Sequence, residues 1–592
     1  MTTTPFRRLG GFGAASLLAA SLVLIQVLIG GRRLIYAFPA YALLVAAAAL
    51  AFVACARART KADARCLGAT AIFFAYILVR NLLSPAPYFA REDLYSVLAA
   101  LLVYGIVATQ LTSAAQRLTL IVMLLGAALG HVAIGFAQFS RGDNLMLISF
   151  LQRVDYGQRA SGFYVCPNHL AGLLEVVGIF GVSLTCWSRW PVWAKLLTGY
   201  ATVVCYVGLA LTGSRGGYVS VVASLLVFGA SSLFLLRAAR PARWLKVGAW
   251  GAGGLAAIAL VAAALIHQNG FLKQRAGNII DTKNMRLDLW RAAVTQWQLQ
   301  PVFGTGSGTY RFYGRQFRTK QVQNDPIDVH NDYLHLLCEY GLLGLAGFAL
   351  FLFAHLRRGW AGLRRFAGRM ASGHGALSGN RLALNLGALG ALAAYVVHSA
   401  FDFNLHIPAN ALLLAFVFGI LANPGDSNHP APSGGALARV PQIALAALAA
   451  VLLLQSVRLL PAEYYAEHAR TALRDEDPTA SLLYADQALQ SERANPYLHF
   501  YRGRAFGALA LAEGDDGART RLLERALASF QEAHRLAPLD GNGVLDLALT
   551  FDQMGRFEEA DAAYALARQR DPHAEAVAQF YQYHLDQRAA AR

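Results

Sequence analysis

Long apolar stretches, separated by short polar segments, follow one another along the chain up to about residue 460. An α-helix needs about 17–25 mostly apolar residues to cross the hydrocarbon core of a membrane. Stretches of this kind lie at 11–31, 34–55, 66–84, 94–111, 118–139, 169–187, 196–213, 217–236, 247–266, 333–355, 381–400, 406–422 and 441–460. The pattern therefore predicts an all-α protein, a polytopic membrane helical bundle of about 13 spans.

Changes in polarity divide the chain into parts. Residues 1–422 form the predicted membrane bundle, which is interrupted by a large polar loop at 268–332. Residues 423–440 have the Pro, Gly and Ser content of a flexible linker, and 441–460 is the last predicted span. The remaining residues, 461–592, are polar, and we predict that they form a separate helical domain.

The C-terminal domain contains a repeating pattern of large and small residues. Between 541 and 574 these residues fall on the positions that a tetratricopeptide repeat uses to interlock its helices. They are Leu547, Phe551, Gly555, Ala560, Tyr564, Ala567 and Pro572, and Ala526, Phe530, Ala533 and Pro538 repeat part of the pattern upstream. We predict about three repeats, which either support the membrane bundle or form a groove for a partner protein or an acceptor.

Basic residues in the short loops predict the orientation of the chain in the membrane. Three clusters of Lys and Arg fall on the same side of the predicted bundle: Arg57, Arg59, Lys61 and Arg65; Arg237, Arg240, Arg243 and Lys246; Arg357, Arg358, Arg364, Arg365 and Arg369. The positive-inside rule makes this side cytoplasmic. The N-terminus and the linker at 423–440 are then cytoplasmic, and the loop at 268–332 and the C-terminal domain lie outside.

Composition narrows the class of protein. The chain is 56% hydrophobic and 15% charged, whereas soluble domains average about 25% charged residues. Its net charge of +17 is largely the bias of the cytoplasmic loops, and no soluble basic domain is predicted that would bind nucleic acid. The six cysteines lack metal-ligand spacing, so we expect neither a metal site nor a cofactor.

Arginines on the outer side are more informative, because the positive-inside rule does not predict them. Arg159 and Asn168 lie at the two ends of a polar segment before one span. Arg215 is at the start of another span, next to Gly216 and Gly217. An arginine at a span end often reaches towards lipid headgroups. A planar guanidinium also suits phosphate oxygens, and glycines at a helix N-terminus let a phosphate approach the backbone. We predict that Arg159, Asn168 and Arg215 bind an anionic substrate.

The loop at 268–332 is also basic. Between 268 and 331 it contains nine Lys and Arg residues against four Asp residues, a net charge of +5. A predicted amphipathic helix begins at Arg286 and carries Trp290 and Trp297, which suits the membrane interface. We predict that Arg286 and Arg291 contribute to substrate binding.

A glycine-rich turn at 301–308 follows this predicted helix. It lacks the spacing of nucleotide-binding loops. We expect it either to cap an anionic lipid headgroup or to be a solvated surface loop.

His330 and Asn331 close the loop where it meets the next span. A histidine, whose unperturbed pKa is near 6.5, suits a general base that activates an acceptor hydroxyl, and Asn331 is then a neighbouring substrate ligand. The alternative is a structural role for His330 beside Asp332, a predicted N-cap.

Glu339, His398 and Asp402 are weaker candidates for supporting residues. His335 and Glu339 are one helical turn apart, as are His398 and Asp402. Buried ion pairs explain this spacing nearly as well as proton relays do.

Together these residues resemble the O-antigen ligase and polymerase superfamily, which also includes protein O-oligosaccharyltransferases. The family signature in the last large loop is His followed by Asn, Ser or Gln, nine residues, and then Gly-x-x-Gly, Thr or Tyr. His330, Asn331, Gly341 and Gly344 match it in full. The segments around Arg159 and Arg215 also resemble family elements, in the same order.

The resemblance implies that a glycan is transferred from undecaprenyl diphosphate to an acceptor hydroxyl at the periplasmic face of the bacterial inner membrane, without a metal. It implies that His330 is the catalytic base and that Arg215 and Arg159 neutralise the diphosphate. The acceptor stays open: lipid A core, another polysaccharide or a protein. Ligase, polymerase and protein oligosaccharyltransferase therefore remain alternatives.

A membrane transporter is an alternative from another class. A transporter places ionisable residues near the middle of its spans, and Glu339 is the residue that favours this interpretation. A scaffold without catalytic activity leaves the outer arginines unexplained.

Overall fold

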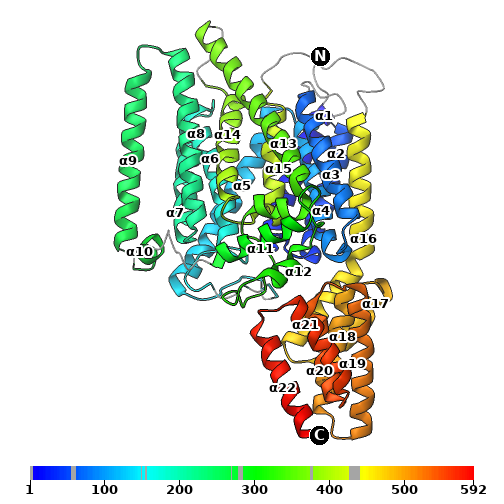
Figure 1. Ribbon diagram of the computed structural model, residues 1–592. Coiled ribbons are helices and arrows are strands. Elements are labelled where there is room, and N and C mark those ends of the chain that lie inside the picture. Colours follow the sequence, from blue (N-terminus) through cyan, green and yellow to red (C-terminus); the bar gives the residue numbers. More distant parts are fainter. Residues whose placement is uncertain are drawn as a thin grey trace. The chain divides into compact units, whose positions relative to one another are not determined.

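The computed structural model describes residues 5–54, 62–148, 150–151, 153, 156–268, 270–277, 285–373, 378–425 and 440–591. These residues form helices and connecting turns without a β-strand, so the predicted all-α class is confirmed (Figure 1). Within the described ranges, 11 helices are long and apolar enough to cross a membrane. The chain is therefore a multi-span membrane protein.

The helices divide into two compact units, residues 1–75, 95–283 and 346–453 in the first and residues 76–94, 284–345 and 454–592 in the second. We call them the membrane unit and the loop–tail unit. The sequence interpretation had instead separated the loop at 268–332 from the C-terminal domain. In the described part of the structure, loop residues from 285 onwards are grouped with the C-terminal domain, whereas the start of the loop belongs to the membrane unit.

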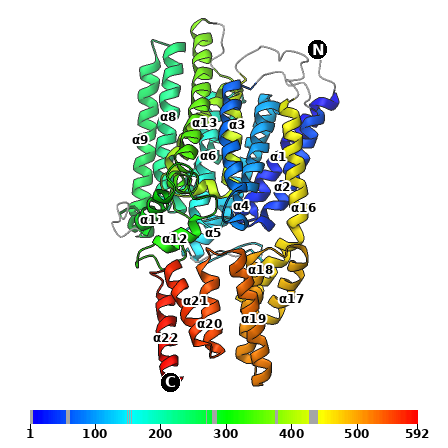
Figure 2. The same ribbon diagram turned by 45° about the vertical axis from the view of Figure 1, so that its right-hand side comes forward.

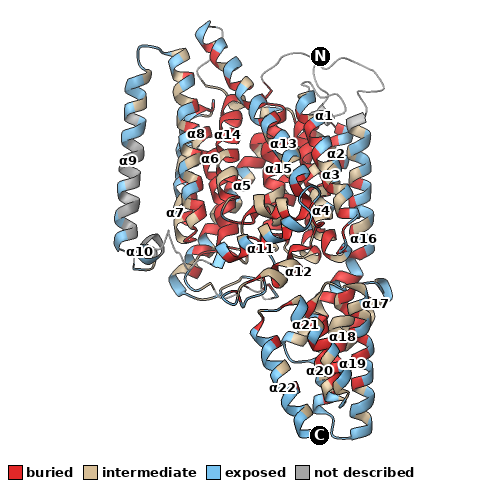
Figure 3. Cartoon of the chain, in the orientation of Figure 1, coloured by how far each residue is buried: buried red, intermediate tan, exposed pale blue. Residues whose placement is uncertain are grey.

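The membrane unit is a helical bundle with largely buried helices at its centre. Its helices are α1 (Pro5–Val27), α2 (Leu34–Ala54), most of α3 (Ala64–Leu82) and of α4 (Pro87–Gly105), α5 (Ala114–Arg141), α6 (Pro167–Trp187), α7 (Val192–Leu211), α8 (Arg215–Ala239), α9 (Trp244–Gln268), α10 (Gly270–Gly277), most of α13 (Asp332–Ala371), α14 (Asn380–His398), α15 (Pro408–Ala422) and the start of α16 (Val440–Arg474). Most residues of α6, α14 and α15 are buried, whereas α7 and α8 expose many apolar side chains, as lipid-facing helices do (Figure 3).

Small residues allow the central helices to approach closely. A Cβ atom on Gly387 of α14 would lie 2.4 Å from Cδ1 of Phe180, and one on Gly181 of α6 would lie 2.1 Å from Oγ1 of Thr202. Such contacts exclude a side chain, and close packing of this kind drives helix association in membranes. The glycines therefore place α6 against both α14 and α7.

Two predicted spans lie outside the set of 11. The span predicted at 247–266 coincides with α9, and the span predicted at 406–422 coincides with the 15-residue apolar helix α15. The exact number of spans stays a prediction. Most of the predicted linker at 423–440 lies outside the described residues.

Two helices continue beyond the spans predicted for them. Helix α13 (Asp332–Ala371) includes the basic cluster that we expected in a loop after residue 355, and α16 (Val440–Arg474) runs through Pro461 into the C-terminal domain. Arginine, leucine and alanine are strong helix formers. A helix can therefore continue beyond the residue at which its apolar stretch ends.

The loop–tail unit combines short loop helices with helical hairpins. The unit contains the end of α3, the start of α4, the start of α13 and the end of α16. Its other helices are α11 (Met285–Leu299), α12 (Tyr310–Phe317), α17 (Pro478–Ser491), α18 (Pro496–Ala512), α19 (Asp516–Leu536), α20 (Gly541–Gln553), α21 (Phe557–Arg570) and α22 (Glu575–Ala591). In the tail, each helix from α17 to α21 packs against the next (Figures 1 and 2).

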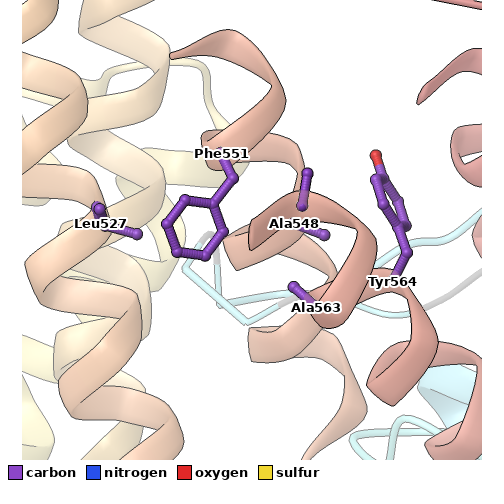
Figure 4. Packing of buried hydrophobic residues seen from close by; sticks show 6 residues of the cluster. Leu527, Ala548, Phe551, Ala563 and Tyr564 are labelled. Carbon is purple, nitrogen blue, oxygen red and sulfur yellow. The ribbon is translucent and has the colours of Figure 1, made fainter. Parts of the chain in front are cut away.

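The predicted repeat residues lie inside these hairpins. Phe551, Ala560 and Tyr564 belong to one buried cluster, which also contains Ala548 and Leu527 (Figure 4). Gly555 forms the turn between α20 and α21 with a φ of +70°. The arrangement agrees with a helical repeat, and its assignment as a tetratricopeptide repeat stays a prediction.

Candidate active site

The first candidate element lies in the connection between α5 and α6, in the membrane unit. The Arg159 guanidinium donates from Nε to the Thr212 carbonyl at 2.8 Å and from a terminal nitrogen to Oδ1 of Asn168 at 2.6 Å. The Ala160 amide donates to the Leu211 carbonyl at 3.0 Å. The structure therefore brings Arg159 and Asn168 together and joins them to the turn before Arg215.

That turn builds the N-terminus of α8. Ser214 is the N-cap, and its hydroxyl accepts a hydrogen bond from the Gly217 amide at 3.2 Å. Gly213 has a φ of +60°, and half-buried Arg215 is the first residue of the helix. The N-terminus of a helix has partial positive charge, so this turn and Arg215 together favour an anion.

Gly216 and Gly217 serve helix packing. A Cβ atom on Gly216 would lie 3.1 Å from Cδ2 of His398, and one on Gly217 would lie 3.0 Å from the Cβ of Ala171. We had predicted these glycines as a path for a phosphate to the backbone. The contacts show that they let the first turn of α8 approach α14 and α6, and the path for a phosphate stays a prediction.

His398 pairs with a residue that the sequence analysis missed. Both carboxylate oxygens of Glu175 lie 3.0–3.1 Å from Nδ1 of His398, and both residues are fully buried. Helix α14 ends at His398, so Asp402 lies beyond the helix, and the predicted relation of His398 to Asp402 stays a prediction. Oδ1 of buried Asp402 accepts from the Phe403 amide at 2.9 Å.

One feature of the sequence does point to Glu175. It is the only acidic residue in the predicted span at 169–187. A carboxylate inside a span is costly unless it is paired, so its presence indicates a buried partner.

Several connections meet at the same end of the membrane unit as Arg159 and Arg215. The Arg32 guanidinium lies 5.3 Å from the ring centre of Phe403. A Cβ atom on Gly30 would contact both Ile407 and Tyr164 at 2.9 Å. The connections α1–α2, α5–α6, α7–α8 and α14–α15 therefore form one polar end of the bundle.

His330 lies in the loop–tail unit with a strained backbone. Its φ is +56°, a left-handed conformation that is uncommon for residues other than glycine and often marks functional positions. Its side chain is half-buried, and its carbonyl accepts from Nε1 of Trp290 at 3.3 Å. Tight packing of the loop therefore holds the residue in this conformation.

Asn331 is the N-cap of α13. Its Oδ1 accepts from the amides of Tyr333 and Leu334, each at 3.0 Å. The prediction that Asp332 is the N-cap was wrong, because the helix begins one residue earlier than expected. The cap fixes the direction in which the chain leaves His330.

Helix α11 confirms the predicted helix but not its predicted surroundings. Trp290 and Trp297 pack on a buried cluster that includes Tyr310 and Val329. The two indoles thus face the core of the loop, where we had expected the membrane interface. Exposed Arg291 pairs with Asp288 at 3.1 Å, and Arg286 is half-buried. Their role in substrate binding stays a prediction.

The glycine-rich turn binds a carboxylate of the chain itself. Gly304, Gly306 and Gly308 all have positive φ. The Gly308 amide donates to Oε2 of Glu339 at 3.0 Å, and the Tyr310 amide donates to Oε1 at 2.9 Å. Glu339 therefore occupies the position that we had predicted for a lipid headgroup, with Nε2 of His335 3.5 Å from its Oε1.

The signature glycines build the junction between loop and helix. Gly341 interrupts α13 with a φ of +68° and a ψ of −170°, and a Cβ atom there would lie 2.3 Å from the Val302 carbonyl. The next two amides donate to the Pro301 and Val302 carbonyls at 2.9 and 3.1 Å. At Gly344, a Cβ atom would lie 2.5 Å from the Cβ of Tyr340. Larger residues therefore do not fit either position.

Residues 200–349 match the O-antigen ligase family model. The match includes Arg215 and the signature from His330 to Gly344, whereas the Arg159–Asn168 segment precedes it. A search of curated proteins finds no match to the chain. The resemblance seen in the sequence is thus confirmed for a quarter of the chain. The protein is a multi-span membrane protein whose residues 200–349 are similar to the O-antigen ligase family, a family of glycosyltransferase-type enzymes.

Proposed function

We propose that the protein transfers a glycan from undecaprenyl diphosphate to an acceptor hydroxyl of lipid A core or another polysaccharide, at the periplasmic face of the inner membrane. The observation that carries the proposal is the construction of the family signature. His330 stands in a strained conformation before a capped short helix, and Gly341 ends that helix against the glycine-rich turn. Backbone strain that is held by a surrounding scaffold is typical of functional sites.

The proposed reaction is a single displacement. The acceptor oxygen attacks the anomeric carbon of the glycan, and its proton passes to the imidazole of His330. The bond between the anomeric carbon and the diphosphate oxygen breaks, and the electron pair leaves with undecaprenyl diphosphate. Arg215 and Arg159 stabilise the negative charge on this leaving group, supported by the N-terminus of α8.

The distribution of charge supports a periplasmic site. Arg215 opens α8, and Arg237 and Arg240 lie at its other end, in one of the three basic clusters. By the positive-inside rule the basic end is cytoplasmic, so the end with Arg159 and Arg215 faces outside. This is the face at which the resemblance implies that the glycan is transferred.

The contacts of Glu339 weaken the case for a transporter. Backbone amides of the glycine-rich turn hold its carboxylate. It therefore acts as a structural anchor of the loop, and the residue that favoured transport in the sequence analysis no longer does so.

Reconstitution tests the proposal. The full chain in proteoliposomes is supplied with an undecaprenyl diphosphate-linked oligosaccharide and, in separate reactions, lipid A core, a polysaccharide or a Ser/Thr peptide. We expect one glycan block on lipid A core or polysaccharide and release of undecaprenyl diphosphate. A ladder of longer lipid-linked glycans would indicate a polymerase, and a glycopeptide a protein transferase. Solute flux without any glycan product would contradict the proposal.

The His330→Ala variant is the internal check on the mechanism. We expect transfer to fall at least about 100-fold, because the acceptor loses its base. His267→Ala, at an exposed histidine near the end of α9, is the matched control and should keep wild-type transfer. Wild-type transfer by His330→Ala would remove the base assignment.

A further inference from the structure

Two buried arginines of the loop bind carboxylates of the tail. Arg315 of α12 donates to both oxygens of Asp325 at 2.6 Å and to Oδ1 of Asp540 at 2.8 Å. Arg318 donates to the two oxygens of Asp571 at 2.8 and 2.6 Å. Both arginine side chains are about 6% exposed. Asp540 caps α20 and Asp571 follows α21, so both partners belong to the tail.

The same contacts organise the backbone of the loop. The third Arg318 nitrogen donates to the carbonyls of Val322 and Gln323, each at 3.1 Å. The Gln323 side chain donates to the His573 carbonyl at 3.1 Å and accepts from the Glu575 amide at 3.1 Å. Hydrogen bonds from Arg318 and Gln323 therefore join the turn after α12 to the connection between α21 and α22.

An aromatic cluster forms a second contact within the loop–tail unit. Phe89 of α4 packs against Phe312 of α12 and against Tyr497 of α18, with ring centres 5.3 and 5.4 Å apart. Beside it, Arg91 donates to Glu463 and, at 2.6 Å, to Glu492. The tail thus contacts both the loop and the start of α4.

Buried charges make these contacts dependent on each other. Burial lowers the pKa of Arg315, but Asp325 and Asp540 more than offset this, so its pKa lies above the ordinary value. Arg318 pairs with Asp571 of the tail, and a buried arginine that loses its carboxylate is left charged without compensation, which is strongly destabilising. The loop conformation therefore needs the tail carboxylates.

The clamped segment leads directly to His330. Val322 and Val329 are buried along it, and the chain then reaches His330, whose carbonyl is held by Trp290. Since only a short segment separates Arg318 from His330, release of Arg318 frees the residues that hold the strained backbone. The effect of the tail is thus transmitted along the chain.

We propose that Asp540 and Asp571 are positioning residues, through which the C-terminal helices clamp the segment 315–331 and present His330 to the substrate. The inference rests on the proposed function only for the catalytic role of His330. It assigns this face of the tail to the chain's own loop, and a partner protein would have to use another face.

A charge swap tests the clamp. The full-length variants Arg318→Asp, Asp571→Arg and the double variant are compared in proteoliposomes with the lipid-linked oligosaccharide and lipid A core. In each single variant we expect hydrogen exchange of residues 318–331 to accelerate about tenfold or more. We expect kcat to fall by a similar factor while KM for the donor changes less than about threefold. The double variant should return both quantities to within about threefold of wild type, because the ion pair is restored.

Controls separate positioning from general damage. Glu532→Arg breaks an exposed ion pair with Arg535 inside the tail and should change neither quantity. Asp571→Glu should keep most activity, and Asp571→Asn replaces Asp571→Arg if the latter does not insert. Wild-type exchange in both single variants, or a double variant no better than the singles, would overturn the clamp. Hydrogen exchange could change with the charge swap as expected while His330→Ala keeps full activity. This result would support the clamp and overturn the proposed function.

Discussion

The membrane unit and the loop–tail unit both bury arginine, and they satisfy it with different partners. In the membrane unit, Arg117 of α5 is 2% exposed, and its nitrogens donate to the carbonyls of Val107, Leu111 and Asn423 at 2.6–2.8 Å. In the loop–tail unit, Arg318 donates to both carboxylate oxygens of Asp571. One cation is bound by peptide dipoles and the other by an opposite charge.

The difference shows what each arginine does for the fold. The carbonyls around Arg117 lie at the ends of helices, where carbonyl groups lack helical partners and the dipole is negative. Arg117 therefore joins the ends of elements that are already formed. Arg318 joins segments 253 residues apart, so it determines which parts of the chain come together. A swap of charges can restore the second arrangement, but not the first.

Arg117→Leu should have the largest effect. The change removes three hydrogen bonds and leaves buried carbonyls without their donor, which costs about 4 kcal/mol or more. We expect a clear loss of thermal stability in detergent, with Arg117→Lys recovering part of it. Arg189→Leu, at an exposed arginine that donates to the Ser378 carbonyl, is the control. A stable Arg117→Leu protein would mean that the carbonyls find other donors.

Glu339→Ala tests the reverse arrangement, an anion bound by backbone amides in the loop–tail unit. Loss of the bonds from Gly308 and Tyr310 should cost about 3 kcal/mol. We expect faster hydrogen exchange at these two amides, with a smaller change in Glu339→Gln. Glu513→Ala, which removes an exposed acceptor from the Gly514 turn, should leave them unchanged. Unchanged exchange in Glu339→Ala would show that the turn is stable without the carboxylate.

Arg215→Lys tests whether an arginine of the membrane unit binds the substrate. Lysine keeps the charge but loses the planar fork that matches two phosphate oxygens. We expect transfer to fall about 100-fold, which corresponds to about 2.7 kcal/mol of transition-state stabilisation. Arg243→Lys, at an exposed position between α8 and α9, should transfer normally. Equal rates would remove Arg215 as a diphosphate ligand.

Asp546→Asn should have the smallest effect, and we expect the substitution to stabilise the fold. Burial raises the pKa of Asp546 in α20 to about 6, although Arg504 counteracts this. A carboxyl whose pKa is raised on folding stabilises the fold at pH values below its unfolded pKa, near 3.9. This contribution is lost as the pH rises through 6, and the free energy of unfolding then falls by roughly 1–3 kcal/mol. We expect the α20 amides to be better protected at pH 4.5 than at pH 7.5, after correction for intrinsic exchange rates. Asp546→Asn should remove most of this difference, and Asp486→Asn should not. A pH-independent wild type would contradict the expectation.

Much of the membrane unit was predictable, because a span is a local property. The apolar run at 169–187 corresponds closely to α6 (Pro167–Trp187), and length and hydropathy alone explain it. The end of α13 was not predictable in the same way. Its basic residues beyond 355 read as a cytoplasmic loop, although the same residue types also continue a helix.

The candidate site was predictable in its segments but not in its pairings. The Arg159–Asn168 contact joins residues of one short segment that was singled out as a unit. The Glu175–His398 pair joins positions 223 residues apart, and the Arg318–Asp571 pair joins positions still farther apart. Charge complementarity permits many such partners in a chain with 52 basic and 35 acidic residues. Only the fold selects among them.

The break at Gly341 has a consequence for how positions in α13 are counted. The backbone ladder stops there and starts again at Leu342, whose amide donates to Pro301. The rotational phase of the helix is therefore reset between its two parts. A side chain before Gly341, such as His335, cannot be assigned to a face of the longer part by counting 3.6 residues per turn. A cysteine-accessibility scan along α13 should show two periodic patterns that are out of phase, with the discontinuity at the first glycine of the family signature.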